Sequence, residues 1–138
     1  MLASFEAFAE HKGCNALLMG DLNWNEGGRP YANSSTRFTK VVDGELPLPD
    51  GWCDSWTVAN PTAGFDDSCT YHSKRNAMLR GSLRYRCDRV LLRGGPELVV
   101  GVRQVGTEPI PGITAAVGND ATRKVLPSDH FGLVSDFS

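Results

Sequence analysis

Short apolar runs, separated by loops rich in Gly and Pro, constrain the fold of this chain more than any other feature. The first run, "NALLMGD" (residues 15–21), follows a segment (residues 2–12) whose apolar residues have the three-and-four spacing of an amphipathic helix, ended by Gly13. Because both faces of the run are apolar, it predicts a fully buried strand of the kind found in parallel sheets.

The later runs predict further strands and one more helix. "DSWTVANP" predicts a short helix that Asp54 or Ser55 caps and Pro61 ends. Strands are predicted in "SCTYHS", "LRYRCDRVLLRG", "ELVVGVRQVGTEPI" and the terminal "FGLVSDF". Residues 23–51 are predicted to be mainly loop with one short piece around residues 38–42, and Pro109, Pro111 and Gly118 predict a second loop. Strands outnumber helices, so the fold class is α+β or a layered α/β sandwich.

Composition is that of an ordinary globular domain, and the pattern of the amino end favours an intracellular protein. With 138 residues, 41% hydrophobic and 22% charged, it has the size of one domain or part of one. No apolar run is long enough to span a membrane, and the amino end has no secretory pattern, so we expect a soluble protein of the nucleus or cytoplasm. The four cysteines lack metal-binding spacing and are expected to be free and mostly buried.

The positive charges are concentrated in one segment. The net charge is −2, yet residues 74–93, "KRNAMLRGSLRYRCDRVLLR", contain seven cations and one anion. Arginine favours planar, bidentate contact with phosphates, so this segment predicts either a phosphate-binding surface or a solvated cationic face.

Three short polar motifs contain the residues that could perform chemistry. In "GDLN", Asp21 and Asn23 would point to the same side if the strand extends to its end, where they could bind a cation, a water or a phosphate oxygen, or simply cap backbone amides. In "SDH", Asp129 and His130 are a possible metal ligand and acid/base residue, or a turn. In "RCDRV", Asp88 needs a partner, either a neighbouring arginine or a histidine whose tautomer it would fix.

Taken in this order, the three motifs resemble the endonuclease/exonuclease/phosphatase superfamily of metal-dependent phosphodiesterases, which has a DNase I-like fold. The stretches "TYHSKRNAMLRGSLRYRCDRVLL" and "PSDHFGLV" are most similar to the tyrosyl-DNA phosphodiesterase 2 branch. The similarity covers residues 14–137 in scattered blocks.

The resemblance implies a role for each motif residue. Asp21 would orient or deprotonate the attacking water, and Asn23 would contact the scissile phosphate. Asp129 would lie at the metal site, while His130, oriented by Asp88, would contact the phosphate.

The resemblance also implies a cofactor and a substrate. The metal would be Mg²⁺ or Mn²⁺, which prefer oxygen ligands. Thr70 and Tyr71 match the family's threonine-aromatic pair near the nucleic-acid surface, and Arg86 matches its strand arginine; without the resemblance, Tyr71 would be a core-edge aromatic. DNA is therefore the expected partner. A phosphoinositide or sphingolipid phosphodiesterase, or a non-catalytic remnant that binds nucleic acid or a partner protein, stays open.

The family's domain is about twice as long as this chain. It is a four-layer α/β/β/α sandwich whose first half supplies an asparagine strand and the glutamate that is the main metal ligand. Glu6 and Glu10 lie on the predicted opening helix and Glu26 lies in a Gly-rich loop, so none matches that glutamate. We therefore expect residues 1–138 to be the carboxyl-terminal half of one such domain, with an uncovered apolar sheet face and an incomplete metal site.

Overall fold

The computed structural model describes residues 14–24, 26, 44–81, 83–117 and 121–138. This described part is mixed helix and strand, as the predicted α+β class requires. Its elements are β1 (Ala16–Asp21), β2 (Trp52–Asp54), α2 (Ser55–Ala59), α3 (Phe65–Ser68), β3 (Tyr71–His72), β4 (Arg84–Tyr85), β5 (Asp88–Arg93), the 3₁₀ turn η1 (Pro96–Leu98), β6 (Val99–Val105), β7 (Thr114–Val117), β8 (Ala121–Lys124) and β9 (Gly132–Phe137). The predicted segments 2–12 and 38–42 lie outside the described residues.

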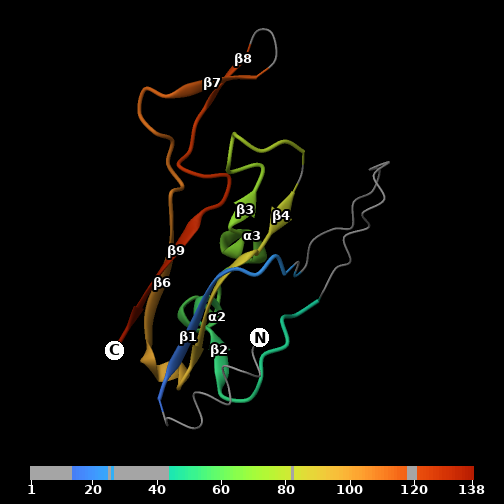
Figure 1. The fold of residues 1–138 in the computed structure, drawn as a ribbon. Helices are drawn as coiled ribbons and strands as arrows, with labels where there is room; N and C mark the ends of the chain where they lie inside the picture. Colours follow the sequence, from blue (N-terminus) through green and yellow to red (C-terminus); the bar gives the residue numbers. More distant parts are fainter. Residues whose placement is uncertain (1–13, 25, 27–43, 82, 118–120) are drawn as a thin grey trace.

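The strands form one three-stranded sheet and three antiparallel pairs (Figure 1). In the larger sheet β5 lies between β1 and β2, and both neighbours are antiparallel to it. Strands β3 and β4 pair, β6 pairs with β9, and β7 pairs with β8 in a hairpin that extends away from the other strands. Helix α2 packs against β5 and β6 and so joins the larger sheet to the β6–β9 pair.

Strand β5 is the centre of the core. Its four residues Arg89 to Leu92 are all buried, so both faces of this strand are covered. Trp52, Trp56 and Phe131 from other segments are also buried, which places the main hydrophobic core around β5 and α2.

Strand β1 differs from the prediction. It is antiparallel to β5 and lies at the edge of the sheet, with Leu17 43% and Met19 63% exposed. A run with two apolar faces cannot by itself distinguish a central strand from an edge strand whose second face lacks cover, which is why the prediction of a fully buried strand was wrong. The two exposed side chains agree with the expectation of an uncovered apolar face.

The remaining predictions are largely confirmed. Helix α2 begins after Asp54, whose Oδ1 accepts a hydrogen bond from the Trp56 backbone amide at 3.0 Å, and it ends before Pro61. The "LRYRCDRVLLRG" run is divided between β4 and β5. The predicted loop between Pro109 and Gly118 contains strand β7, and the prediction missed this strand as well as β2, α3 and β8. No helix of the described part is long and apolar enough to cross a membrane.

Candidate active site

Two of the predicted site residues face each other where β1 and β5 meet. Asp21 is the last residue of β1, Asp88 is the first of β5, and the strand register pairs them directly. Directly opposed residues of an antiparallel pair project from the same face, and two like charges in that arrangement destabilise a sheet unless a cation lies near. The strand ends therefore present two carboxylates on one face.

Asp88 has a histidine partner. Its Oδ2 lies 2.8 Å from Nδ1 of His130, and both side chains are about three-quarters buried, with exposed fractions of 22% and 25%. A carboxylate at Nδ1 favours the tautomer that carries its proton there, which leaves Nε2 to face a ligand, and it stabilises the ring when protonated. Of the two partners considered for Asp88, a neighbouring arginine or a histidine, the structure has the histidine.

The backbone around this dyad is held by Thr70. The Thr70 hydroxyl accepts a hydrogen bond from the Asp88 backbone amide at 3.1 Å, and the Thr70 carbonyl accepts one from the Phe131 amide at 2.8 Å. Thr70 has no exposed surface. It thus joins the segments that carry Asp88 and His130 from inside the protein.

Tyr71 lies beside the dyad. Its ring meets the His130 ring edge to face, with centroids 5.1 Å apart, and stacks on Tyr85 at 5.9 Å. Tyr71 is half-buried, so its position fits both predicted roles, a contact residue and a core-edge aromatic.

Asp21 and Asn23 form a turn at the strand end. The Asn23 backbone amide donates a hydrogen bond to Asp21 Oδ1 at 2.7 Å, and Asn23 has a positive φ of 51°. The strand stops at Asp21, so alternation along a strand does not place the Asn23 side chain. This is the capping arrangement considered from the sequence, and it leaves both residues exposed at the site.

Asp129 is exposed on the turn that precedes β9. Its Oδ1 accepts a hydrogen bond from the Ser128 hydroxyl at 3.3 Å, and the same hydroxyl accepts one from the His130 amide at 3.1 Å. The local turn thereby fixes Asp129 and His130 relative to each other.

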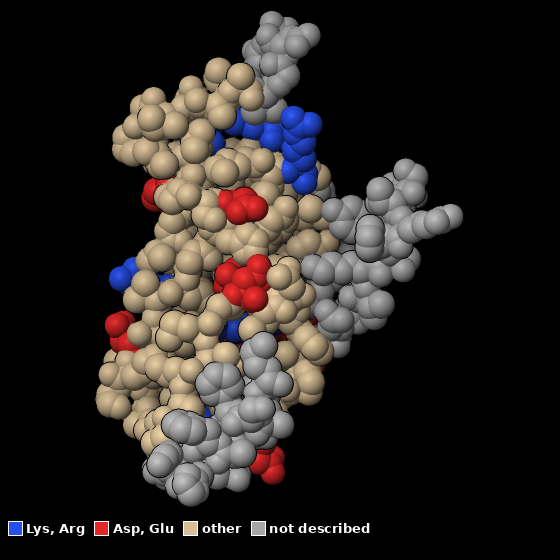
Figure 2. All heavy atoms as spheres, in the orientation of Figure 1, with Lys and Arg blue, Asp and Glu red and all other residues tan. Residues whose placement is uncertain are grey.

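Charges of the basic segment do not form one surface. On the face shown in Figure 2, acidic side chains form patches in the middle of the molecule, and basic side chains gather below the β7–β8 hairpin. Lys74 and Arg80 are exposed, whereas Arg86 and Arg89 are 4% and 1% exposed. The two interpretations of the sequence, phosphate binding and a solvated face, do not describe these two arginines.

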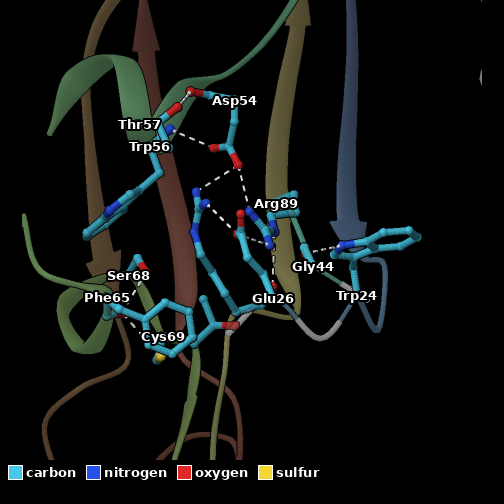
Figure 3. A network of polar contacts seen from close by, with 12 residues as sticks. Trp24, Glu26, Gly44, Asp54, Trp56, Thr57, Phe65, Ser68, Cys69 and Arg89 are labelled. Atoms are coloured by element: carbon cyan, nitrogen blue, oxygen red, sulfur yellow. Dashed lines mark hydrogen bonds and ion pairs between the residues drawn. The ribbon is translucent and has the colours of Figure 1, made fainter. Parts of the chain in front are cut away.

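Arg86 and Arg89 belong to a buried group that we call the charge network, made of Glu26, Asp54, Arg86 and Arg89. Asp54 Oδ2 accepts hydrogen bonds from Arg86 at 2.7 Å and Arg89 at 2.8 Å, and Glu26 Oε2 accepts from them at 3.2 and 2.8 Å. Figure 3 shows Asp54 and Glu26 on either side of Arg89. Burial lowers the pKa of the Arg86 guanidinium, and Asp54 opposes that shift.

The sequence did not predict the roles of three residues, two in the charge network and one beside the turn that carries His130. Glu26 and Asp54 neutralise the two buried arginines, and Asp54 was predicted only as a helix cap. Asn76 is fully buried and donates hydrogen bonds to the carbonyls of Ser128 and Asp129. The signal for the first two was the excess of arginine in a predicted strand, because a buried guanidinium requires a carboxylate.

The residues that could hold a metal are few in this structure. Within the described ranges no group of three or more His, Cys, Asp or Glu side chains lies close enough to hold an ion. Asp21 and Asp129 are exposed carboxylates, and Mg²⁺ is commonly held by one or two carboxylates together with substrate phosphates. The two carboxylates therefore fit part of such a site, and the remaining ligands would come from elsewhere.

All four cysteines are free, as predicted. Cys69 and Cys87 are buried, Cys53 is half-buried and Cys14 is exposed. Burial raises the pKa of the Cys69 thiol to about 12, with a smaller contribution from Asp66.

Comparison with known proteins identifies the fold. No protein-family model and no curated protein matches the sequence. A crystal structure of truncated Caenorhabditis elegans TDP2 is 22% identical with a TM-score of 0.61, and the match covers 99% of this chain and 44% of the other. Two further crystal structures, of TDP2 and of its selenomethionine form from C. elegans, are 20% identical with a TM-score of 0.63, covering 98% of this chain and 33% of theirs.

These matches confirm the resemblance in fold that the motifs predicted. The chain spans less than half the length of the solved TDP2 chains that it matches. It therefore has the DNase I-like fold of TDP2, over part of the length of those structures.

Proposed function

We propose that this chain carries part of the active site of a phosphodiesterase that hydrolyses phosphodiester bonds in DNA, with 5′-tyrosyl DNA ends as the first substrate to test. The single observation that supports it best is the Asp88–His130 dyad, with Asp21 directly opposite Asp88. A histidine, the carboxylate that orients it through Nδ1 and a second, exposed carboxylate can activate a water and stabilise the charge that develops on a phosphate during hydrolysis.

Each group has a distinct task in the proposed reaction. The Asp21 carboxylate orients the attacking water or removes its proton, and Asn23, next to it, contacts the scissile phosphate. His130 donates a hydrogen bond from Nε2 to a phosphate oxygen, where negative charge increases during displacement. Asp88 stabilises the protonated imidazole that this hydrogen bond requires.

A divalent cation, Mg²⁺ or Mn²⁺, is the cofactor of this proposal. Asp129 would be its protein ligand in this chain, with phosphate oxygens of the substrate completing part of the shell. When bound, the metal supplies neutralisation of the phosphate charge.

DNA is proposed over a lipid phosphate for two reasons. The solved structures that resemble the chain are of TDP2, and exposed cations of the chain, Lys74 and Arg80, are available for contacts with a phosphate backbone. Thr70 and Arg86 are buried, so Tyr71 is the one residue of the three proposed contacts that has exposed surface near the dyad.

We also propose that the complete catalytic unit contains more than these 138 residues. The coverage of 44% and 33% of the TDP2 chains supports this proposal. The additional residues would cover the exposed face of β1 and complete the metal site.

The test is hydrolysis with Mg²⁺ of an oligonucleotide bearing a 5′-phosphotyrosyl group, and of bis-p-nitrophenyl phosphate. It uses this chain and, if the gene encodes further residues, the longer product. Asp21→Ala and His130→Ala should each lower kcat by at least about 100-fold, the scale of one general acid–base contribution. If the unmodified protein cleaves these substrates no faster than either variant, the catalytic role of Asp21 and His130 is excluded and a non-catalytic binding protein is left.

A further inference from the structure

The turn that carries Asp129 and His130 is held from one side by the segment 70–78. Thr70 accepts a hydrogen bond from the Phe131 amide at 2.8 Å, and the Met78 sulfur accepts one from the Leu126 amide at 3.2 Å. These two contacts lie at either end of the turn. Between them, the Asn76 side chain donates hydrogen bonds to the backbone of the turn, and the Tyr71 ring meets the His130 ring edge to face.

Asn76 uses both polar atoms of its side chain to fix backbone. Its Nδ2 donates hydrogen bonds to the carbonyl of Ser128 at 2.9 Å and to the adjacent carbonyl of Asp129 at 3.1 Å. Its Oδ1 accepts a hydrogen bond from the Met78 amide at 3.0 Å. The side chain has no exposed surface, so no water replaces these partners in the folded state.

The two carbonyls that Asn76 holds belong to the residues immediately before His130. Rotation of either peptide would turn the His130 side chain and move Nδ1 away from Asp88. The His130 amide is also tied to Ser128, by a 3.1 Å hydrogen bond to its hydroxyl, so a shift of Ser128 is transmitted to His130.

We propose that Asn76 is a positioning residue of the site: its amide fixes the Ser128–Asp129 and Asp129–His130 peptides and so keeps His130 in the ring orientation and tautomer that Asp88 requires. The proposal deepens the function proposed above and rests on it. A carboxylate, an alcohol or an aliphatic side chain at this position lacks the paired N–H donors that two adjacent carbonyls need.

The chain offers a matched control in Asn60. Its Nδ2 also donates to two backbone carbonyls, those of Trp56 at 3.3 Å and Val102 at 3.2 Å, but it joins α2 to β6 and touches neither the dyad nor the turn. Loss of either amide removes the same kind of contact, so a general loosening of the fold would follow from both.

The experiment compares Asn76→Ala, Asn76→Asp and Asn60→Ala in the full chain. The first readout is the ¹⁵N chemical shifts of the His130 ring, assigned by their loss in His130→Gln, because these shifts report which ring nitrogen carries the proton. At a pH where the substrate-free ring is neutral, we expect the unmodified chain and Asn60→Ala to keep the Nδ1–H tautomer and both Asn76 variants to show a mixture of tautomers. An unchanged tautomer in Asn76→Ala, or the same mixture in Asn60→Ala, would overturn the proposal.

The second readout is hydrolysis of bis-p-nitrophenyl phosphate. We expect Asn76→Ala to lower kcat by about 10- to 100-fold with little change in KM, since a misplaced catalytic group costs rate more than binding. If neither the chain nor a longer product of its gene hydrolyses this ester, the proposed function is refuted, while the tautomer comparison still decides the role of Asn76.

A direct measurement decides the case in which both Asn76 variants fail to fold. In the unmodified chain, through-bond couplings from Asn76 Nδ2 to the carbonyl carbons of Ser128 and Asp129 report the two hydrogen bonds. Couplings to both carbonyls support the proposal, and their absence contradicts it.

Discussion

Replacement of Asp54 by asparagine tests the charge network. Asp54 is 7% exposed, and its Oδ2 accepts hydrogen bonds from two guanidinium groups that are themselves 4% and 1% exposed. The Asp54→Asn variant would keep the size of the side chain and a good helix cap, but it would leave Arg86 and Arg89 with Glu26 as their remaining carboxylate. Removal of one partner from a buried ion pair costs about 3–5 kcal/mol of unfolding free energy.

The assay is urea unfolding followed by circular dichroism. The dependence of the unfolding free energy on urea concentration should be the same in all variants, which shows that they unfold by the same reaction. We expect Asp54→Asn to lower the unfolding free energy by about 3–5 kcal/mol, or to be unfolded in water if the chain is less stable than that. Asp54→Ala should lose about 1 kcal/mol more, because it also removes the cap from Trp56.

Two further variants serve as controls for this reasoning. Glu26 is 23% exposed, so Glu26→Gln should cost less than half as much as Asp54→Asn. The double variant Asp54→Asn, Arg89→Met should lose less unfolding free energy than the sum of the losses of the two single variants. The reason is that Arg89→Met removes a buried charge that Asp54→Asn leaves unpaired. A loss below about 1 kcal/mol for Asp54→Asn would refute the view that these arginines depend on Asp54.

Three more outcomes are expected. At pH 8 a thiol reagent should modify the exposed Cys14 and spare Cys69, and raising the pH to about 10 should leave Cys69 unreactive in the folded chain, because burial raises its pKa to about 12; mass spectrometry of labelled peptides checks this. Met19→Lys should reduce self-association in sedimentation velocity and change the unfolding free energy by no more than about 0.5 kcal/mol, because Met19 is 63% exposed on an edge strand. Arg123→Met should speed proteolysis of the β7–β8 hairpin, since Arg123 donates hydrogen bonds to the Ala77 and Leu79 carbonyls at 3.1 and 3.2 Å.

Local signals predicted the elements that depend on local chemistry. The cap at Asp54 and the stop at Pro61 define α2, and apolar runs mark β5, β6 and β9. The prediction of Asp88 as a possible partner of histidine followed from its place next to an apolar run, and the 2.8 Å contact with His130 agrees with it.

Features that depend on distant segments could not be read in the same way. The position of β1 at a sheet edge depends on what covers its second face, and its own residues do not encode that. The partners of Arg86 are 60 and 32 residues away in the sequence, so the excess of arginine suggested an external phosphate instead of internal carboxylates. Asn76 had no sequence signal, because its amide acts on backbone carbonyls 52 and 53 residues away.

Strand β5 contributes to the proposed active site on one face and to the charge network on the other. Asp88 contacts His130, and the next residue, Arg89, enters the charge network on the opposite face. A shift of the register of this strand by one residue would exchange the two, turning a carboxylate into the core and a guanidinium toward the dyad. Natural length variation in related sequences should therefore avoid β5 and accumulate in the loops, and only paired changes on both faces could alter this strand without loss of both properties.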